Sequence, residues 1–155
     1  MSVGEGDMAP EFEMPATGGR TVSLAGLKGK PFVLYFYPKA DTPGCTTESQ
    51  DFSALVADFE QIGTTVIGVS RDPVKKLDRF KAKHDLKVVL ASDEPEDVTE
   101  AFGVWVEKTL YGRAYMGIER TTMLIDAQGK IARIWSKEKV PGHAEEVLAA
   151  AQKLT

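Results

Sequence analysis

The sequence predicts an α/β fold with a mixed central sheet, helices on both faces and a short N-terminal β extension. Two observations lead to this prediction. Apolar runs typical of buried strands alternate along the chain with amphipathic helical patterns, and this order builds sheets whose strands are joined by helices. Near the C-terminus two strand patterns follow one another as a hairpin and a final helix closes the chain.

The clearest strand pattern covers residues 32–37, FVLYFY, where six apolar residues are stopped by Pro38. An uninterrupted apolar run of this kind is typical of a strand buried on both faces. Residues 12–24 form a short extended part before it. Further strands are expected over residues 64–70, 88–91, 121–126 and 130–135. The last two flank Ala127-Gln128-Gly129, which predicts a tight turn with glycine in a left-handed conformation.

Helical patterns fill the intervals between the strands. One apolar stripe with the spacing i, i+3, i+4 and i+7 predicts a single helix that carries Phe52, Leu55, Val56 and Phe59 on its buried face. Asp72 is expected to cap the next helix, with Pro73 at its first position. Pro95 is expected to start a short helix that Gly103 ends, and residues 147–154 indicate a C-terminal helix.

Length and composition predict one domain covering residues 1–155. The chain has 155 residues, of which 43% are hydrophobic and 27% charged, as in ordinary globular proteins. The net charge is −4, and acidic and basic residues are interspersed along the chain. Neither nucleic acid nor an anionic membrane is therefore expected as a partner. No apolar run approaches the ~18 residues of a membrane span, and no secretory signal is recognisable. We therefore expect a cytoplasmic protein.

Cysteine and histidine usage limits the possible chemistry. Cys45 is the only cysteine, which excludes an internal disulfide, a four-cysteine zinc site and an iron-sulfur cluster within one chain. The two histidines, His84 and His143, form no HExxH motif, so we expect neither a metal nor another cofactor. We expect His84 to be solvated at a helix end and assign no role to His143.

The position of Cys45 nevertheless points to reactivity. It lies just after the first long strand, at the carboxyl end of that strand. In open α/β sheets, ligand sites are found at the carboxyl ends of the strands. If Thr42 caps the next helix and Pro43 takes its first position, Gly44 and Cys45 lie in the first turn. Unpaired N–H groups and the helix dipole there favour a thiolate over a thiol. Most lone cysteines are inert packing residues. Such cysteines are typical of the middle of a strand or helix, whereas Cys45 stands at a helix start.

This segment resembles the active site of a known family. The pattern Pro38-x-x-x-Thr42-x-x-Cys45 matches the peroxiredoxins, and YFYPKADTPGCTTE is similar to their bacterioferritin-comigratory-protein (PrxQ) subgroup. The resemblance continues through GVSRDP, GVWVEK and YGRAYMGIERTTMLID. It implies a thioredoxin-like fold, which the closing hairpin and helix also favour, and a thiol-dependent peroxidase that reduces hydrogen peroxide and organic hydroperoxides.

The resemblance also implies roles for individual residues. Cys45 would be the nucleophile that attacks a hydroperoxide and becomes a sulfenic acid. The Thr42 hydroxyl would hydrogen-bond the sulfur and the peroxide, and Pro38 would shield the pocket from water.

The remaining roles concern charge. Arg120 would hold the sulfur anionic and stabilise charge that moves onto the peroxide oxygens. Backbone N–H groups of Gly44 and Cys45 would serve the same purpose, and Glu48 would orient the arginine from behind.

The chain departs from the family at the second cysteine. In the PrxQ subgroup that this chain resembles, many members carry a resolving cysteine at the position of Gln50, and others carry one near Lys81. With neither present, the Cys45 sulfenic acid needs an external thiol: thioredoxin, glutathione with a glutaredoxin, or another small thiol. We expect a monomer or a weak homodimer.

Two other functions remain open at this point. A thioredoxin-fold domain could sense redox state or act like a chaperone without turnover at Cys45. A Cys-His hydrolase is the weaker alternative, because only His84 and His143 could serve as its base.

Overall fold

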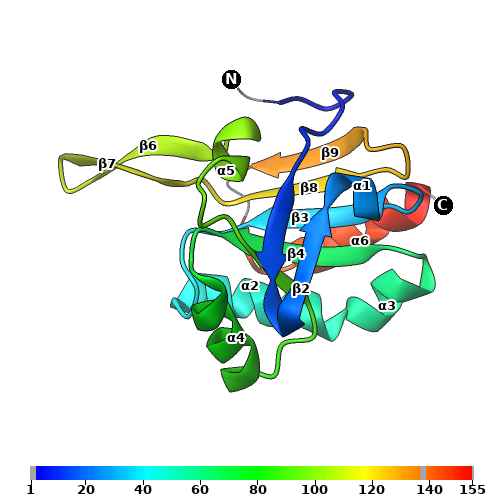
Figure 1. Cartoon of the computed structure of the whole chain (residues 1–155), viewed down its shortest axis with the longest axis horizontal. Coiled ribbons are helices and arrows are strands. Elements are labelled where there is room, and N and C mark those ends of the chain that lie inside the picture. The colour runs from blue at the N-terminus through cyan, green and yellow to red at the C-terminus, as the bar shows by residue number, and fades with distance from the viewer. Residues whose placement is uncertain (1–2, 137–138, 155) are drawn as a thin grey trace.

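The computed structural model describes residues 3–136 and 139–154 and has a seven-stranded mixed sheet at its centre (Figure 1). The strand order is β2-β1-β5-β4-β3-β8-β9. The middle strands β3, β4 and β5 run parallel, whereas β8, β9, β1 and β2 add antiparallel edges. The bounds are β1 Glu13–Ala16, β2 Arg20–Ser23, β3 Phe32–Phe36, β4 Thr65–Ser70, β5 Val89–Ser92, β8 Thr121–Ile125 and β9 Ile131–Ser136. The predicted mixed sheet with an N-terminal β extension is confirmed.

Strand β3 divides the core into two layers because its side chains alternate between the faces of the sheet. One face of β3 contributes Phe32, Leu34 and Phe36 to a core with the short helices α1 (Leu24–Leu27) and α5 (Val98–Ala101). The other face contributes Val33 and Tyr35 to a core with the longer helices. These are α2 (Pro43–Ala54), α3 (Val56–Gln61), α4 (Val74–Lys83) and α6 (His143–Leu154). Helices therefore flank both faces, as predicted.

The helix predicted through Phe52 and Phe59 is two helices. The chain leaves α-helical geometry at Leu55 (φ −105°, ψ 4°), whose N–H donates to the Phe52 carbonyl three residues back. Both phenylalanines are still fully buried in one core with Cys45. The apolar spacing therefore predicted the correct buried face. It did not predict the break between α2 and α3, because such spacing carries no information about a local change in the backbone.

Two predicted helix starts are also wrong. Helix α4 begins after Pro73, and Asp72 instead accepts hydrogen bonds from the Ala40 N–H and the Ser70 hydroxyl. Helix α5 begins at Val98 rather than at Pro95. A buried carboxylate decides this start, because Asp93 accepts hydrogen bonds from the first N–H groups of α5. The predicted stop at Gly103 is confirmed by its φ of +74°.

A second, two-stranded sheet was missed by the sequence patterns. Strands β6 (Trp105–Leu110) and β7 (Arg113–Ile118) form a hairpin that projects from the body of the molecule (Figure 1). Its turn is the pair Tyr111 and Gly112, both with positive φ, as two-residue hairpin turns require. Most of its side chains are exposed, so no apolar run marks either strand. The hairpin is fixed at its base by Arg71, whose guanidinium stacks 3.4 Å above the Trp105 ring.

The core leaves no room for a side chain at Gly68 on β4. A Cβ at this position would lie 2.5 Å from Cζ of Tyr35, whose hydroxyl is hydrogen-bonded to Ser49 on α2. We therefore expect Gly68→Ala to destabilise the protein by about 1–3 kcal/mol, measured as the free energy of unfolding in urea. The matched control is Gly4→Ala, where the nearest atom is 3.6 Å from the new Cβ. Equal unfolding free energies for the two variants would contradict the packing argument.

Candidate active site

The first turn of α2 places Cys45 at the end of the central strand. Pro43 is the first helical residue, and Thr42 has the extended backbone of a cap residue. Cys45 is buried, with 2% of its surface exposed. The N–H groups of Gly44 and Cys45 have no hydrogen-bond acceptor among the residues that the structure describes. These donors and the helix dipole therefore remain available to an anion at the sulfur.

Arg120 reaches this helix end from the short connection between β7 and β8. Its Nη2 lies 3.4 Å from Sγ of Cys45, and its Nη1 donates to Oε1 of Glu48 at 2.5 Å. Gly44 lies against the same guanidinium, since a Cβ there would be in van der Waals contact with Nη2 at 3.4 Å. The guanidinium is thus shared between a sulfur and a carboxylate that lie on one helix.

Glu48 is a buried carboxyl with an unusual charge balance. Burial raises its pKa to about 7, against the lowering effect of Arg120. Its second oxygen, Oε2, has no hydrogen-bond partner among the described residues. Burial also lowers the pKa of Arg120, but the charges of Glu48 and Cys45 outweigh this and leave that pKa above its usual value. Arg120 therefore stays cationic while Glu48 can gain or lose a proton near neutral pH.

Thr42 and Pro38 lie on the loop that leads into α2. The Thr42 hydroxyl donates to the Lys39 carbonyl at 2.8 Å rather than to a helix N–H or to the sulfur. Its oxygen lone pairs are left to accept a hydrogen bond. Pro38 is exposed and lines a groove beside the site. The structure thus brings Arg120 into contact with both Cys45 and Glu48 and places Thr42 and Pro38 on the loop that leads into α2.

A groove of about 440 Å³ lies between this loop and the β6–β7 hairpin; we call it the hairpin groove. Its walls come from the active-site loop, the segment after β4 and both hairpin strands. The lining residues are Pro38, Lys39, Arg71, Asp72, Pro73, Glu96, Trp105, Lys108, Tyr115, Met116, Gly117 and Ile118. The sequence patterns did not indicate these hairpin residues, because the hairpin itself was not predicted. Tyr111, in the turn of the hairpin, is 94% exposed.

Neither histidine is hydrogen-bonded to Cys45. His84 is not simply solvated, as expected from the sequence: its Nε2 lies 2.9 Å from Oδ1 of Asp41, and four-fifths of its side chain is buried. His143 is buried in the core, with its Nε2 2.9 Å from the Thr122 hydroxyl. Both rings therefore have structural partners, and the arrangement offers no base for the hydrolase alternative.

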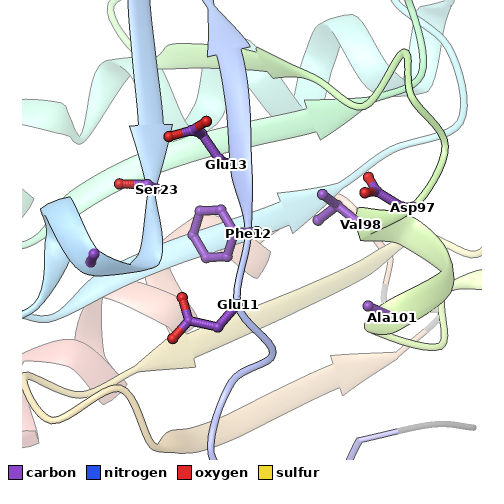
Figure 2. Close-up of a pocket in the computed structure, with 8 residues that line it drawn as sticks. Glu11, Phe12, Glu13, Ser23, Asp97, Val98 and Ala101 are labelled. Atoms are coloured by element: carbon purple, nitrogen blue, oxygen red, sulfur yellow. The ribbon is translucent and has the colours of Figure 1, made fainter.

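A larger hollow of about 580 Å³ lies on the other side of the sheet (Figure 2). Glu11, Glu13 and Asp97 contribute carboxylates to it, and Phe12 and Val98 contribute apolar surface. Neither cysteine nor histidine is among the residues that line it. Among residues 3–136 and 139–154, no group of three His, Cys, Asp or Glu side chains is arranged to hold a metal ion, and no helix is long and apolar enough to cross a membrane.

Comparison with known proteins gives the class of this chain. Residues 5–134 match the AhpC/TSA family. The chain is 47% identical to a putative peroxiredoxin Bcp of Coxiella burnetii, over 96% of this chain and 98% of the relative. It is 43% identical to peroxiredoxin Bcp of Bacillus subtilis, over 100% and 99% of the two chains.

Solved structures agree. A cysteine-to-serine mutant of Xylella fastidiosa PrxQ superposes with a TM-score of 0.92 at 41% identity, covering 99% of this chain and 98% of the other. A Xanthomonas campestris bacterioferritin comigratory protein, described for alkyl peroxide reduction, gives 0.87 at 44% identity, over 92% and 90%.

The chain therefore belongs to the AhpC/TSA family of thioredoxin-like proteins. Within that family it is a peroxiredoxin of the Bcp (PrxQ) group, and thus a thiol peroxidase. The predicted family, fold and enzyme class are confirmed.

The titration of Glu48 should appear in the stability of the protein. Because its pKa rises from 4.5 to about 7 on folding, the folded state keeps a proton that the unfolded chain releases above pH 4.5. The stability from this group is therefore full below pH 4.5 and is lost as the pH rises through 7. Relative to Glu48→Gln, which cannot titrate, the wild type should lose up to about 3 kcal/mol across this window.

Urea unfolding from pH 4.5 to pH 8 measures this difference. The same substitution at the exposed Glu107 controls for the loss of one negative charge. Parallel stability profiles for the wild type and Glu48→Gln would show that Glu48 is ionised throughout.

Proposed function

We propose that Cys45 is the peroxidatic nucleophile of this enzyme and that Arg120 and the N-terminus of α2 hold its thiolate. The observation that carries the proposal is the 3.4 Å contact between Nη2 of Arg120 and Sγ of Cys45 in the first turn of the helix. Two sources of positive potential, a guanidinium and free backbone N–H groups, converge there on one sulfur.

The same groups serve the reaction. The thiolate attacks the terminal oxygen of a hydroperoxide, an S–O bond forms and the O–O bond breaks. The leaving hydroxide or alkoxide takes a proton and departs as water or alcohol, while the sulfur becomes a sulfenic acid. Negative charge moves from sulfur to oxygen during this step. The Arg120 guanidinium, together with the Gly44 and Cys45 N–H groups of the first helical turn, would stabilise that charge as it develops.

The residues at the entrance position the substrate. Because the Thr42 hydroxyl gives its proton to the Lys39 carbonyl, its oxygen can accept a hydrogen bond from the hydroperoxide O–H. Pro38 forms one wall of the entrance and limits access of water. Glu48 orients Arg120 through its Oε1, which keeps the second guanidinium nitrogen directed at the sulfur.

Reduction of the sulfenic acid depends on an external thiol, because Cys45 is the only cysteine. Thioredoxin, or glutathione with a glutaredoxin, can supply it, and the substrates include hydrogen peroxide and organic hydroperoxides. The alkyl peroxide reduction described for the Xanthomonas campestris relative supports the organic class. We place this activity in a single domain covering the chain, acting in the cytoplasm as a monomer or weak homodimer.

Replacement of the sulfur tests the proposal. With excess dithiothreitol, the wild type should consume hydrogen peroxide catalytically, and Cys45→Ser should leave only the uncatalysed rate. Peroxide consumption and the mass of the protein after one equivalent of peroxide measure this. Equal rates for both proteins would overturn the proposal, and a single sulfenylation without turnover would point to a redox sensor.

Arg120 should act on the rate of peroxide attack. Arg120→Met removes the guanidinium from the sulfur, and we expect the second-order rate constant of Cys45 oxidation to fall at least about 100-fold. Stopped-flow fluorescence can follow this step.

This variant also leaves the buried Glu48 without its partner, which costs stability on its own account. The double variant Arg120→Met/Glu48→Gln removes that unpaired carboxylate. A rate that recovers with stability in the double variant would assign Arg120 a purely structural role.

A further inference from the structure

The sulfur that must be reduced from outside is almost fully buried. Cys45 is 2% exposed, in the first turn of α2 and in contact with the Arg120 side chain. A small thiol needs only an open path from the entrance. The hairpin groove lies beside that entrance, with Pro38 and Lys39 of the active-site loop in its wall.

The hairpin groove has the size and surface of a small-molecule site. Its volume of about 440 Å³ falls within the range of ligand pockets, roughly 300–1,000 Å³. Trp105, Tyr115 and Ile118 supply apolar surface along the hairpin side. The Trp105 ring is fixed by the Arg71 guanidinium above it, so this part of the wall is rigid.

Most of the charged groups in the groove are already engaged. Arg71 donates to the Thr99 hydroxyl and the Glu96 carbonyl and is paired with the Glu96 carboxylate. Asp72 accepts from the Ala40 N–H and the Ser70 hydroxyl and pairs with Lys76.

Two cations remain. Lys39 and Lys108 have no ion-pair partner within the described parts of the chain. The groove therefore presents two cations with which a bound anionic molecule can pair.

Lys108 supplies the cation on the hairpin side of the groove. Its side chain lies across Gly117 on the partner strand, where an added Cβ would be 3.4 Å from its Cδ. Burial and the charge of Arg120 lower the pKa of Lys108, while Glu119 and Cys45 raise it. The charges of Arg120 and Cys45 thus act on Lys108, and Ile118, which also lines the groove, lies two residues before Arg120.

We propose that the hairpin groove binds a small thiol that carries carboxylates, and that Lys108 and Lys39 pair with those carboxylates. This inference rests on the proposed function, because it requires a Cys45 sulfenic acid. The thiol sulfur attacks the sulfenic sulfur, an S–S bond forms, the S–O bond breaks and the hydroxyl leaves as water with one proton. A second thiol then attacks the mixed disulfide and releases Cys45 with a symmetrical disulfide. Two thiols are oxidised for each peroxide reduced.

The resolving step can be measured alone. The full chain is oxidised with one equivalent of hydrogen peroxide, and its sulfenic acid is verified by mass. It is then mixed with glutathione, 2-mercaptoethanol or cysteamine, which are anionic, neutral and cationic thiols. For each protein the readout is the ratio of the glutathione rate constant to the 2-mercaptoethanol rate constant. Intrinsic thiol reactivities cancel when these ratios are compared between variants.

Lys108→Gln should lower this ratio about two- to fivefold, and Lys108→Glu should lower it further and raise the relative rate of cysteamine. Added salt should lower the glutathione rate of the wild type but not the 2-mercaptoethanol rate. Lys153→Gln, at an exposed position on α6, is the matched control and should keep the wild-type ratio.

Two results would overturn the inference. One is a ratio that is the same in the wild type, Lys108→Gln and Lys108→Glu. The other is a sulfenic acid that only a dithiol protein such as thioredoxin reduces. Failure to form a sulfenic acid at all would instead overturn the proposed function, so the two failures are distinguishable.

Discussion

The site depends on how one guanidinium divides its hydrogen bonds. Arg120 faces the Cys45 sulfur with one nitrogen and the Glu48 carboxylate with another, and both partners lie on α2. Cys45 and Glu48 are three residues apart, so a single helix face presents them together to an arginine from a distant loop. Glu48 fixes the orientation of the arginine, but in its ionised form it also draws on the positive charge that the sulfur needs. A carboxyl whose pKa is about 7 keeps this competition in balance near neutral pH.

The parts of the fold that bury apolar surface could be predicted from the sequence. Residues 32–37 read as a central strand because every side chain is apolar, and β3 is buried on both faces. Cys45 could be placed at a helix start because Thr42 and Pro43 mark that start locally. Errors arose where a distant group decides the local structure. The start of α5, for example, is set by the Asp93 carboxylate rather than by Pro95.

The charged part of the site was less accessible to sequence reasoning. Arg120 is separated from Cys45 by 75 residues, and only the family resemblance indicated that they meet. The altered ionisation of Glu48 follows from burial, which no local pattern reveals. The β6–β7 hairpin was missed for the opposite reason. Its strands are mostly exposed, and hydrophobic periodicity signals only those elements that cover a core.

The connection between β7 and β8 gives the hairpin a double role. Strand β7 ends at Ile118 and Arg120 follows two residues later, so the ribbon that walls the groove also delivers the guanidinium. Recognition of the incoming molecule and activation of the sulfur are therefore mechanically linked through one short peptide. Evolution or engineering that reshapes the ribbon for a different substrate would also displace the arginine. Selectivity and intrinsic reactivity are thus expected to change together in this architecture.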